Sequence, residues 1–422
     1  MSVRLRLGTS NAALDAAFDP LVARVLAHRG INDPAQVDYQ LKKLLPYHQL
    51  KGIDTAVTLL VQALEAQANI LIVGDFDCDG ATSTSLALLA LGAMGAKNVS
   101  YLVPNRFDFG YGLSTALVDY AKAIEPDLIV TVDNGIASHE GVARAHELGI
   151  KVVVTDHHLA AETLPDADAI VNPNQPGCEF PFKSTAGVGV IFYVMSALRR
   201  QLQTQGWFDQ QGIKAPNMAQ YLDLVALGTV ADLVPMEHNN RILVAQGVAR
   251  IRAGKARPGI LALLAVAKRQ HYNLQATDLG FSIGPRLNAA GRLEDMSLGI
   301  ECLLSDDEHI AAQLAQELDE LNAQRRHIEA DMQQQAGNIL TRLESSQDQE
   351  LPKCVCLFHP DWHQGVVGIV ASRIKEKWHR PALVFAMGDA DTLKGSCRSI
   401  AGFHLRDALA CLLYTSPSPR DS

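Results

Sequence analysis

The chain has 422 residues, of which 48% are hydrophobic and 20% are charged, and its formal net charge is −9. No apolar run reaches the roughly 18 residues of a membrane-spanning helix, and the opening MSVRLRLGTS lacks the apolar core of a signal peptide. We therefore expect a cytoplasmic protein of two or three domains without a membrane segment, and the negative charge weighs mildly against a nucleic-acid binder.

The first half of the chain alternates between strand-like and helix-like segments after a helical, loop-rich lead-in at 1–50. Apolar runs typical of strands lie at 69–73, 99–103, 128–132, 152–155 and 169–171, and helix-length segments lie at 82–94, 114–124 and 138–148. Strands that are apolar on both faces and alternate with helices indicate a parallel sheet covered on both sides. In such a sheet the ligand site lies at the carboxyl ends of the strands.

The second half is predicted to be mostly helical at 187–267 and then to contain one very long helix. Apolar residues recur three, four or seven positions apart, at Ile310, Leu314, Leu318, Leu321, Ile328, Met332, Ile339 and Leu343. A helix of about 35 residues spans roughly 50 Å and can bridge two domains, although a helical hairpin in one domain would show the same pattern. The bridge is favoured because a strand–helix pattern restarts at CVCLF, 366–378 and PALVFA.

Acidic and imidazole side chains follow three of the predicted strands where each strand ends. Strand 69–73 is followed by GDFDCDG, strand 128–132 by DNG and strand 152–155 by DHH. Because the carboxyl ends of parallel strands meet at one edge of a sheet, we expect these groups to converge. Asp232, in GTVADLVP, is a fourth contribution and follows a helical segment.

Carboxylates packed this closely repel one another, so metal ions or protons must neutralise them. Oxygen ligands with one or two imidazoles suit Mn²⁺, Mg²⁺ or Zn²⁺, and about five such ligands favour a pair of ions about 3.5–4 Å apart. Each residue alone has a plainer interpretation, since an Asp that ends a strand is commonly a helix N-cap. The DxDxDG pattern also occurs in calcium loops, but those need a Glu about six residues after the Gly, and position 86 is Leu.

These motifs resemble the DHH phosphoesterase superfamily, named for the triplet found here as Asp156-His157-His158. DFDCDG at 75–80, VDNG at 132–135 and GTVAD at 228–232 match its other motifs in order and spacing. Within the superfamily the chain resembles the RecJ family of exonucleases over nearly its whole length. The similar segments are PNRFDFGYGLS at 104–114, GPRLNAAGRL at 284–293, WHQGVVGIVASRI at 362–374 and GSCRSIAGFHLRDAL at 395–409.

The resemblance implies a 5′→3′ exonuclease that degrades single-stranded DNA to nucleoside 5′-monophosphates in DNA repair and recombination. It implies hydrolysis with two divalent ions, Mn²⁺ or Mg²⁺, and the residues that match the family's ligands are Asp77, Asp79, Asp133, His157 and Asp232. By the same resemblance, Asp75 and Asp156 are catalytic residues that lie next to the metal ligands and help to hold them. His158 stabilises the transition state or protonates the leaving oxygen.

A 5′ polarity needs a receptor for the terminal phosphate, and the fork of an arginine together with Ser hydroxyls matches phosphate oxygens. The candidates for binding this phosphate or the DNA are Arg106, Arg286, Asn288, Arg292, Ser396 and Arg398. An ordinary surface salt bridge is an equally common use for each arginine. Phe107, Phe109 and Tyr111 are candidates for stacking on bases, although the same spacing suits an ordinary strand face.

The implied fold class is α/β, with a parallel-sheet DHH catalytic domain and its helical part at 51–305 and a long connecting helix at 306–346. A partial second α/β domain, DHHA1-like, follows at 347–411. The family's second domain continues to a Gly-Gly-His motif, normally followed by an oligonucleotide-binding barrel, and neither occurs in this sequence. We therefore expect a C-terminally truncated chain with a foreign or disordered tail at 412–422, with a natural short homologue as the alternative.

Two other functions stay open. One is a DHH phosphodiesterase for short oligonucleotides or cyclic dinucleotides, and the other is a non-catalytic DNA-binding scaffold, which is disfavoured because every acid and both histidines are present. The partners implied by the resemblance are single-stranded DNA, a RecQ-type helicase and a single-strand-binding protein. We expect a monomer.

Overall fold

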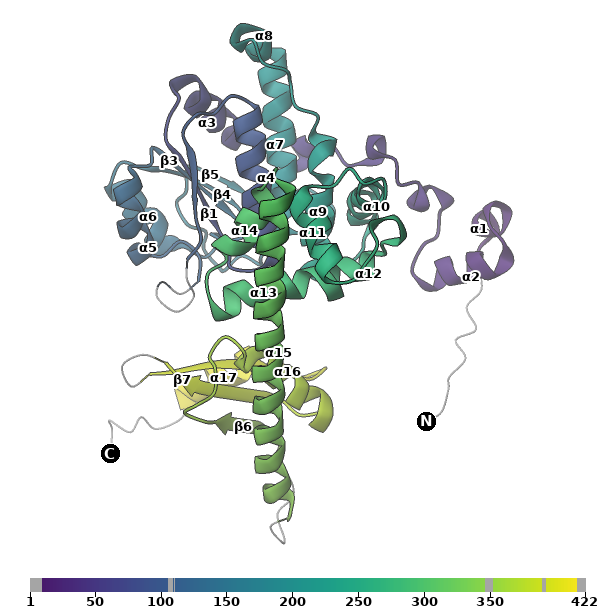
Figure 1. Cartoon of the computed structure of the whole chain (residues 1–422), viewed down its shortest axis with the longest axis vertical. Coiled ribbons are helices and arrows are strands. Elements are labelled where there is room, and N and C mark those ends of the chain that lie inside the picture. The colour runs from purple at the N-terminus through teal and green to yellow at the C-terminus, as the bar shows by residue number, and fades with distance from the viewer. Residues whose placement is uncertain (1–9, 105–108, 110, 346–351, 389–391, 416–422) are drawn as a thin grey trace. The chain divides into compact units, whose positions relative to one another are not determined.

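A computed structural model describes residues 10–104, 109, 111–345, 352–388 and 392–415. The chain divides into two compact units, Met1–Asp319 and Glu320–Ser422, and the division falls inside the long helix α15 (Glu308–Ser345). Each unit contains its own sheet (Figure 1). Within the described ranges, no helix is both long enough and apolar enough to cross a membrane.

The first unit is built around a five-stranded sheet in the order β2-β1-β3-β4-β5. Its strands are β1 (Ile70–Gly74), β2 (Val99–Leu102), β3 (Leu128–Val132), β4 (Lys151–Thr155) and β5 (Ala169–Val171). All neighbouring strands are parallel, and β1 and β3 are buried along their whole length. Burial on both faces explains why these strands are continuous apolar runs. The predicted α/β fold class is confirmed.

Helices cover both faces of this sheet (Figure 1). On one face, α5 (Thr115–Ala121) and α6 (His139–Glu147) pack onto alternate strand residues in one apolar cluster, which includes Leu71, Val73, Leu117, Val118, Ile129, Val142, Val152 and Val154. On the other face lie α3 (Ile53–Ala66), α4 (Cys78–Ala93) and α7 (Gly187–Thr204). Because β2 and β3 pair with opposite sides of β1, the connections diverge at the carboxyl ends of β1 and β3, where parallel sheets form their ligand crevice.

The helical part of the first unit packs beside α4 and α7. Its main helices are α9 (Leu222–Ala231), α10 (His238–Arg252), α11 (Pro258–Val266), α13 (Gly284–Leu293) and α14 (Ser297–Leu304), with the shorter α8 (Trp207–Gln211) and α12 (Ala276–Asp278). Helix α9 contacts α4, α7 and α10, and α13 contacts α4 and α9. The lead-in forms α1 (Ala12–Ala17) and α2 (Pro20–His28) around a small core of Leu14, Ala23 and Ile31.

Helix α15 is continuous over 38 residues. The amphipathic pattern at 310–343 therefore belongs to one helix and not to a hairpin. Its first turns belong to the first unit and the remainder to the second.

The second unit contains a three-stranded sheet in the order β6-β7-β8, formed by β6 (Val355–Phe358), β7 (Ala382–Met387) and β8 (Leu393–Arg398). Strands β6 and β7 are parallel, and β8 is antiparallel to β7. Helix α16 (Val367–Trp378) packs against β7 and β8. Strand β8 was not among the predicted elements. Helix α17 (Leu405–Thr415) runs four residues into the segment expected as a tail, and 416–422 lie outside the described residues.

Candidate metal centre

The loop between β1 and α4, together with the first turn of α4, presents three carboxylates at the carboxyl edge of the sheet. Asp77 is the N-cap of α4, and its Oδ1 accepts hydrogen bonds from the backbone N–H groups of Asp79 (2.8 Å) and Gly80 (3.0 Å). Asp75 is 5% exposed and accepts a bond from the N–H of Phe76. The two bonds to Asp77 use only one of its oxygens, so the N-cap interpretation and the metal-ligand interpretation of this residue are compatible.

Asp79 is buried against the N-terminus of α7. Its Oδ2 accepts a bond from Gly187 N (2.7 Å) and its Oδ1 accepts one from Val188 N (2.9 Å). The positive end of the helix dipole stabilises a carboxylate in this position. A Cβ on Gly187 would lie 2.5 Å from Asp133 Oδ1, and one on Gly228 would lie 2.7 Å from Asp79 Oδ1. These glycines let α7 and α9 approach the carboxylates, and no sequence motif pointed to this role for them.

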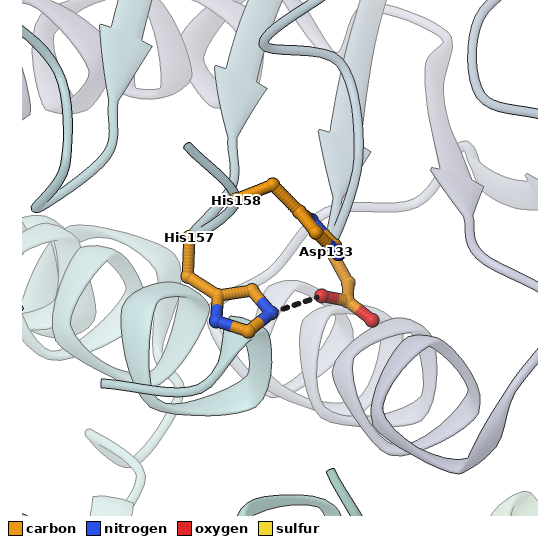
Figure 2. A group of neighbouring side chains, drawn as sticks. All are labelled: Asp133, His157 and His158. Atoms are coloured by element: carbon orange, nitrogen blue, oxygen red, sulfur yellow. Dashed lines mark ion pairs between the residues drawn. The ribbon is translucent and has the colours of Figure 1, made fainter. Parts of the chain in front are cut away.

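Asp133 follows β3 with a backbone φ of 62°, in the left-handed region that residues other than glycine rarely adopt. Its Oδ1 lies 3.1 Å from Nε2 of His157 (Figure 2). Both atoms are buried, and neither has a hydrogen-bond partner among the described residues, because their mutual geometry does not form a hydrogen bond. Two buried polar atoms without partners carry a desolvation cost that a bound cation would offset.

The imidazole of His157 is the centre of the cluster. Its Nε2 lies 3.6 Å from Asp232 Oδ2 and 3.9 Å from Asp79 Oδ2. Three groups have ligand atoms within 4.8 Å of one another, namely Asp133–His157–His158, Asp79–His157–Asp232 and Asp75–Asp77–Asp133. The five predicted ligands and two of the predicted catalytic residues, Asp75 and His158, are therefore brought together in these groups. The third catalytic residue, Asp156, adjoins them through its hydrogen bonds with His157 and His158. Asp133 and His157 each belong to two groups, an arrangement that suits two adjacent ions.

Asp156 is in hydrogen-bonding contact with both histidines. Its Oδ1 accepts hydrogen bonds from the backbone N–H groups of His157 (2.6 Å) and His158 (3.0 Å) and lies 2.8 Å from Nδ1 of His158. Its Oδ2 accepts a bond from Ile136 N (2.9 Å). Asp156 is 1% exposed, whereas the side chain of His158 is 47% exposed. The contact with Asp156 occupies Nδ1 of His158 and leaves Nε2 available to a substrate.

The charges of the cluster shift the pKa values of its members. Burial and the charge of Asp232 raise the pKa of Asp79, burial and Asp79 raise the pKa of Asp133, and burial and Asp77 raise the pKa of Asp232 to about 7. Burial and the neighbouring His158 lower the pKa of His157 to about 4, so its ring is neutral at physiological pH, as a metal ligand must be. The hydrogen bond to Asp156 raises the pKa of His158 to about 9.

These residues fit a divalent cation. Carboxylate oxygens outnumber nitrogens, the His157 ring is neutral, and the raised pKa values of the buried carboxyls reflect a crowding of negative charge that a cation would relieve. This donor set is typical of Mn²⁺ and Mg²⁺ sites.

A cavity of about 560 Å³ opens beside Asp75, Asp156 and His158. Tyr111 lines it, is 53% exposed, and makes edge contacts with the rings of Phe76 and His158. Phe109, which is partly buried, instead packs against Tyr120 and the apolar cluster beneath α5. Phe107 lies outside the described residues.

The predicted phosphate-binding residues fall into two separate groups. Three lie on α13, where Arg286 pairs with Asp319 (2.7 Å), Asn288 accepts a hydrogen bond from Cys78 N (2.7 Å), and Arg292 is in the last turn. The guanidinium of Arg286 and the amide oxygen of Asn288 are thus already engaged within the protein. Arg106 lies outside the described residues.

The other group lies on β8 in the second unit. Arg398 donates from Nη1 to Ser396 Oγ (2.9 Å) and from Nε to Ser372 Oγ (3.0 Å). A Cβ on Gly368 in α16 would lie 3.2 Å from Nη2 of Arg398 and 3.1 Å from Ser396 Oγ. The structure therefore brings Ser396 and Arg398 together and adds Ser372, which the sequence analysis missed.

Comparisons with known proteins identify both units. The DHH family, N-terminal domain, matches residues 69–229, and the DHHA1 domain matches residues 351–413. The chain is 56% identical to the single-stranded-DNA-specific exonuclease RecJ of Salmonella typhimurium, over 96% of this chain and 70% of that protein.

Two solved structures are similar as well. One is exonuclease RecJ bound to manganese, with 35% identity and a TM-score of 0.71 over 87% of this chain and 86% of that one. The other is RecJ of Thermus thermophilus in complex with Mg²⁺, with 32% identity and a TM-score of 0.68 over 94% of this chain and 52% of that one. These relatives bind the two metals that the donor set favours.

Proposed function

This chain belongs to the RecJ family of single-stranded-DNA-specific exonucleases, and we propose that it degrades single-stranded DNA from the 5′ end to nucleoside 5′-monophosphates in DNA repair and recombination. The observation that carries the proposal is the buried contact between His157 and Asp133 at the centre of five potential ligands. No other described cluster of three or more acidic, His or Cys side chains has this geometry.

The cofactors are divalent ions, Mn²⁺ or Mg²⁺, which when bound acidify a water and offset the charge of the phosphodiester. We propose that Asp77, Asp79, Asp133, His157 and Asp232 hold two of them. Asp79 is oriented by its two bonds from α7, and Asp133 by its position after β3. The neutral ring of His157 belongs to two of the three ligand groups.

His158 and Asp156 act on the leaving group in this proposal. Asp156 receives four polar contacts and is rigidly held. It keeps the His158 ring oriented and, by raising its pKa to about 9, protonated at neutral pH. A cationic imidazole whose Nε2 faces solvent can donate a proton to the departing 3′ oxygen or stabilise the charge that develops there.

In this proposal Ser396 and Arg398 bind the terminal 5′ phosphate and so set the 5′ polarity. Their hydroxyl and guanidinium are held together and, with Ser372, present several donors at one place. This combination suits the oxygens of a terminal phosphate. Arg286 and Arg292 on α13 stay candidates for contacts with the DNA backbone, as does Arg106.

The proposed partners follow from the substrate. A nuclease restricted to single strands needs duplex DNA to be opened first, so we propose that a RecQ-type helicase and a single-strand-binding protein work alongside it. A monomer in the cytoplasm stays our prediction.

The test uses a long 5′-phosphorylated single strand labelled at either end, its duplex, and a dinucleotide, each with Mn²⁺. We expect a 5′ label to be released at once as mononucleotide while a 3′ label stays in progressively shorter strands, and the duplex to resist. Preference for the dinucleotide would favour the small-substrate phosphodiesterase, and early release of the 3′ label would reverse the polarity. Binding without hydrolysis would favour the scaffold.

A further inference from the structure

The segment 75–80, which comprises the loop after β1 and the first residues of α4, is held in place by hydrogen bonds from its own backbone N–H groups to Asp75 and Asp77. The first amides of a helix have no acceptor within the helix and need one from elsewhere. Asp77 supplies the acceptor for residues 79 and 80. The N–H of Cys78, the first residue of α4, is left over, and Cys78 is 1% exposed, so water is not a ready substitute.

Asn288, 210 residues further along the chain, supplies the missing acceptor. Its Oδ1 accepts the hydrogen bond from Cys78 N at 2.7 Å. Asn288 lies in the middle of α13, a helix that contacts both α4 and α9. Helix α9 ends immediately before Asp232. Helix α13 is therefore in contact with α4 and α9, two of the elements that present predicted ligands.

Gly291 brings the same helix against the loop a second time. It lies one turn after Asn288, so both residues are on one face of α13. A Cβ at Gly291 would lie 1.9 Å from the carbonyl oxygen of Phe76. Only a glycine permits this approach, and any side chain would push the loop or the helix away.

The N-terminal part of α13 is also held in place, through Arg286. Nη2 of Arg286 lies 2.7 Å from Asp319 Oδ1, and Nη1 donates to Ser282 O (2.5 Å). The Arg286 side chain is 13% exposed and that of Asp319 is 30% exposed, so the ion pair is partly shielded from water. It ties α13 to the first turns of α15.

We propose that α13 is a positioning element of the metal centre, in which Asn288 and Gly291 set the place of the 75–80 loop. Asn288 is a positioning residue, and this replaces its sequence-based assignment as a contact of the substrate. By fixing the N–H of Cys78 and the carbonyl of Phe76, α13 determines where the carboxylates of Asp77 and Asp79 meet Asp133 and His157. The inference rests on the metal centre of the proposed function, but its test measures metal affinity and not hydrolysis.

The test compares Asn288→Ala, Asn288→Asp and Gly291→Ala by titration with Mn²⁺, using the electron paramagnetic resonance of the free ion and the melting temperature without metal. Loss of a residue that orients a metal ligand weakens binding about 10- to 100-fold, so we expect that loss in Asn288→Ala and Gly291→Ala. Asn288→Asp keeps an oxygen acceptor, and its affinity should return close to that of the wild type.

Two matched controls separate positioning from general destabilisation. Asn322→Ala removes a buried asparagine that accepts a bond from Arg325 (2.8 Å) in another part of the chain. Gly337→Ala places a methyl group on a helical glycine with nothing within 4 Å. Both should bind Mn²⁺ like the wild type, even where Asn322→Ala lowers the melting temperature. Wild-type affinity in Asn288→Ala and Gly291→Ala, or equal weakening in Asn322→Ala, would overturn the proposal.

If Asn288→Ala does not fold, the Mn²⁺ affinities of Gly291→Ala and Asn288→Asp decide. Weaker binding in Gly291→Ala with near-wild-type binding in Asn288→Asp supports the proposal, and wild-type binding in Gly291→Ala overturns it. Failure of this proposal leaves the proposed function standing if the wild type still hydrolyses single strands with Mn²⁺. Failure of the proposed function appears as absent hydrolysis with metal binding intact.

Discussion

Nε2 of His157 and Oδ1 of Asp133 lie 3.1 Å apart in the interior of the protein, and neither makes a hydrogen bond within the described residues. Folding tolerates such a pair only if something compensates the lost hydration. Two ligand atoms on one small divalent ion lie about 3 Å apart when each bond is about 2.1 Å long. The separation of these two atoms therefore suits two adjacent ligands of one shared cation.

Asp133→Asn should abolish the stabilisation that metal gives. Asparagine tolerates the left-handed backbone at this position, and the change removes a carboxylate that burial penalises, so the metal-free variant should melt at least as high as the wild type. Mn²⁺ at about 100 times its dissociation constant should stabilise the wild type by about 2.7 kcal/mol and the variant hardly at all. Thermal unfolding with and without Mn²⁺ measures this. The control is Asp361→Asn, at a side chain that is 86% exposed, and an unchanged metal response in Asp133→Asn would show that this carboxylate is no ligand.

His158→Ala should lower kcat without weakening metal binding. A positioned general acid contributes about 10²- to 10⁴-fold to a rate, so we expect a loss of that size. Asp156→Asn should also lower kcat, because His158 loses its carboxylate partner. Single-turnover hydrolysis and Mn²⁺ titration are measured on the same samples. His146→Ala is the matched control, since this histidine also pairs with an aspartate, Asp168 at 3.0 Å, but lies outside the cluster. Loss of Mn²⁺ affinity in His158→Ala would make it a ligand instead.

The affinity for Mn²⁺ should rise with pH through neutrality. Burial raises the pKa of Asp232 to about 7 and also raises the pKa values of Asp79 and Asp133. Below about pH 7 the metal-free Asp232 holds a proton that a cation must displace, and above it Asp232 does not. The raised pKa values of Asp79 and Asp133 act in the same direction, so the sign of the effect is tighter binding at higher pH. Calorimetric titration in buffers of different ionisation enthalpy should record proton release on binding. Binding that is independent of pH and releases no protons contradicts these shifted pKa values.

Arg398→Ala should reduce the preference for a 5′ phosphate over a 5′ hydroxyl. A hydrogen bond to a charged group contributes about 1.5–3 kcal/mol, so the ratio of kcat/KM for the two ends should fall about tenfold or more. Arg380→Ala is the control, because this arginine lies in the same unit and donates to the carbonyl of Pro352. If Arg398→Ala slows both substrates equally, the receptor lies elsewhere, and Arg286, Arg292 and Arg106 are the next to be changed.

The sequence was sufficient to predict the sheet and the metal cluster because their signals are local. Apolar runs that end in acidic residues identify strands and the edge at which their side chains meet, and the residues after β1, β3 and β4 do converge. The periodicity at 310–343 identified the helical segment, and the restart of a strand–helix pattern after it favoured the single continuous helix that α15 forms.

The supporting contacts could not be predicted because they join residues far apart in the chain. The bond from Cys78 to Asn288 and those from Asp79 to α7 span 108–210 positions. Nothing in GPRLNAAGRL indicates that its asparagine faces a loop and not a substrate. Strand β8 was missed because its exposed, polar edge lacks the apolar run of the buried strands.

Diffraction from crystals grown with Mn²⁺, recorded at the manganese absorption edge, tests the metal centre most directly. We predict two anomalous peaks about 3.5–4 Å apart, enclosed by Asp77, Asp79, Asp133, His157 and Asp232, with one of them bonded to both His157 and Asp133. Peaks that lie outside this cluster, or a protein that binds no manganese while it still hydrolyses single-stranded DNA, would contradict the account.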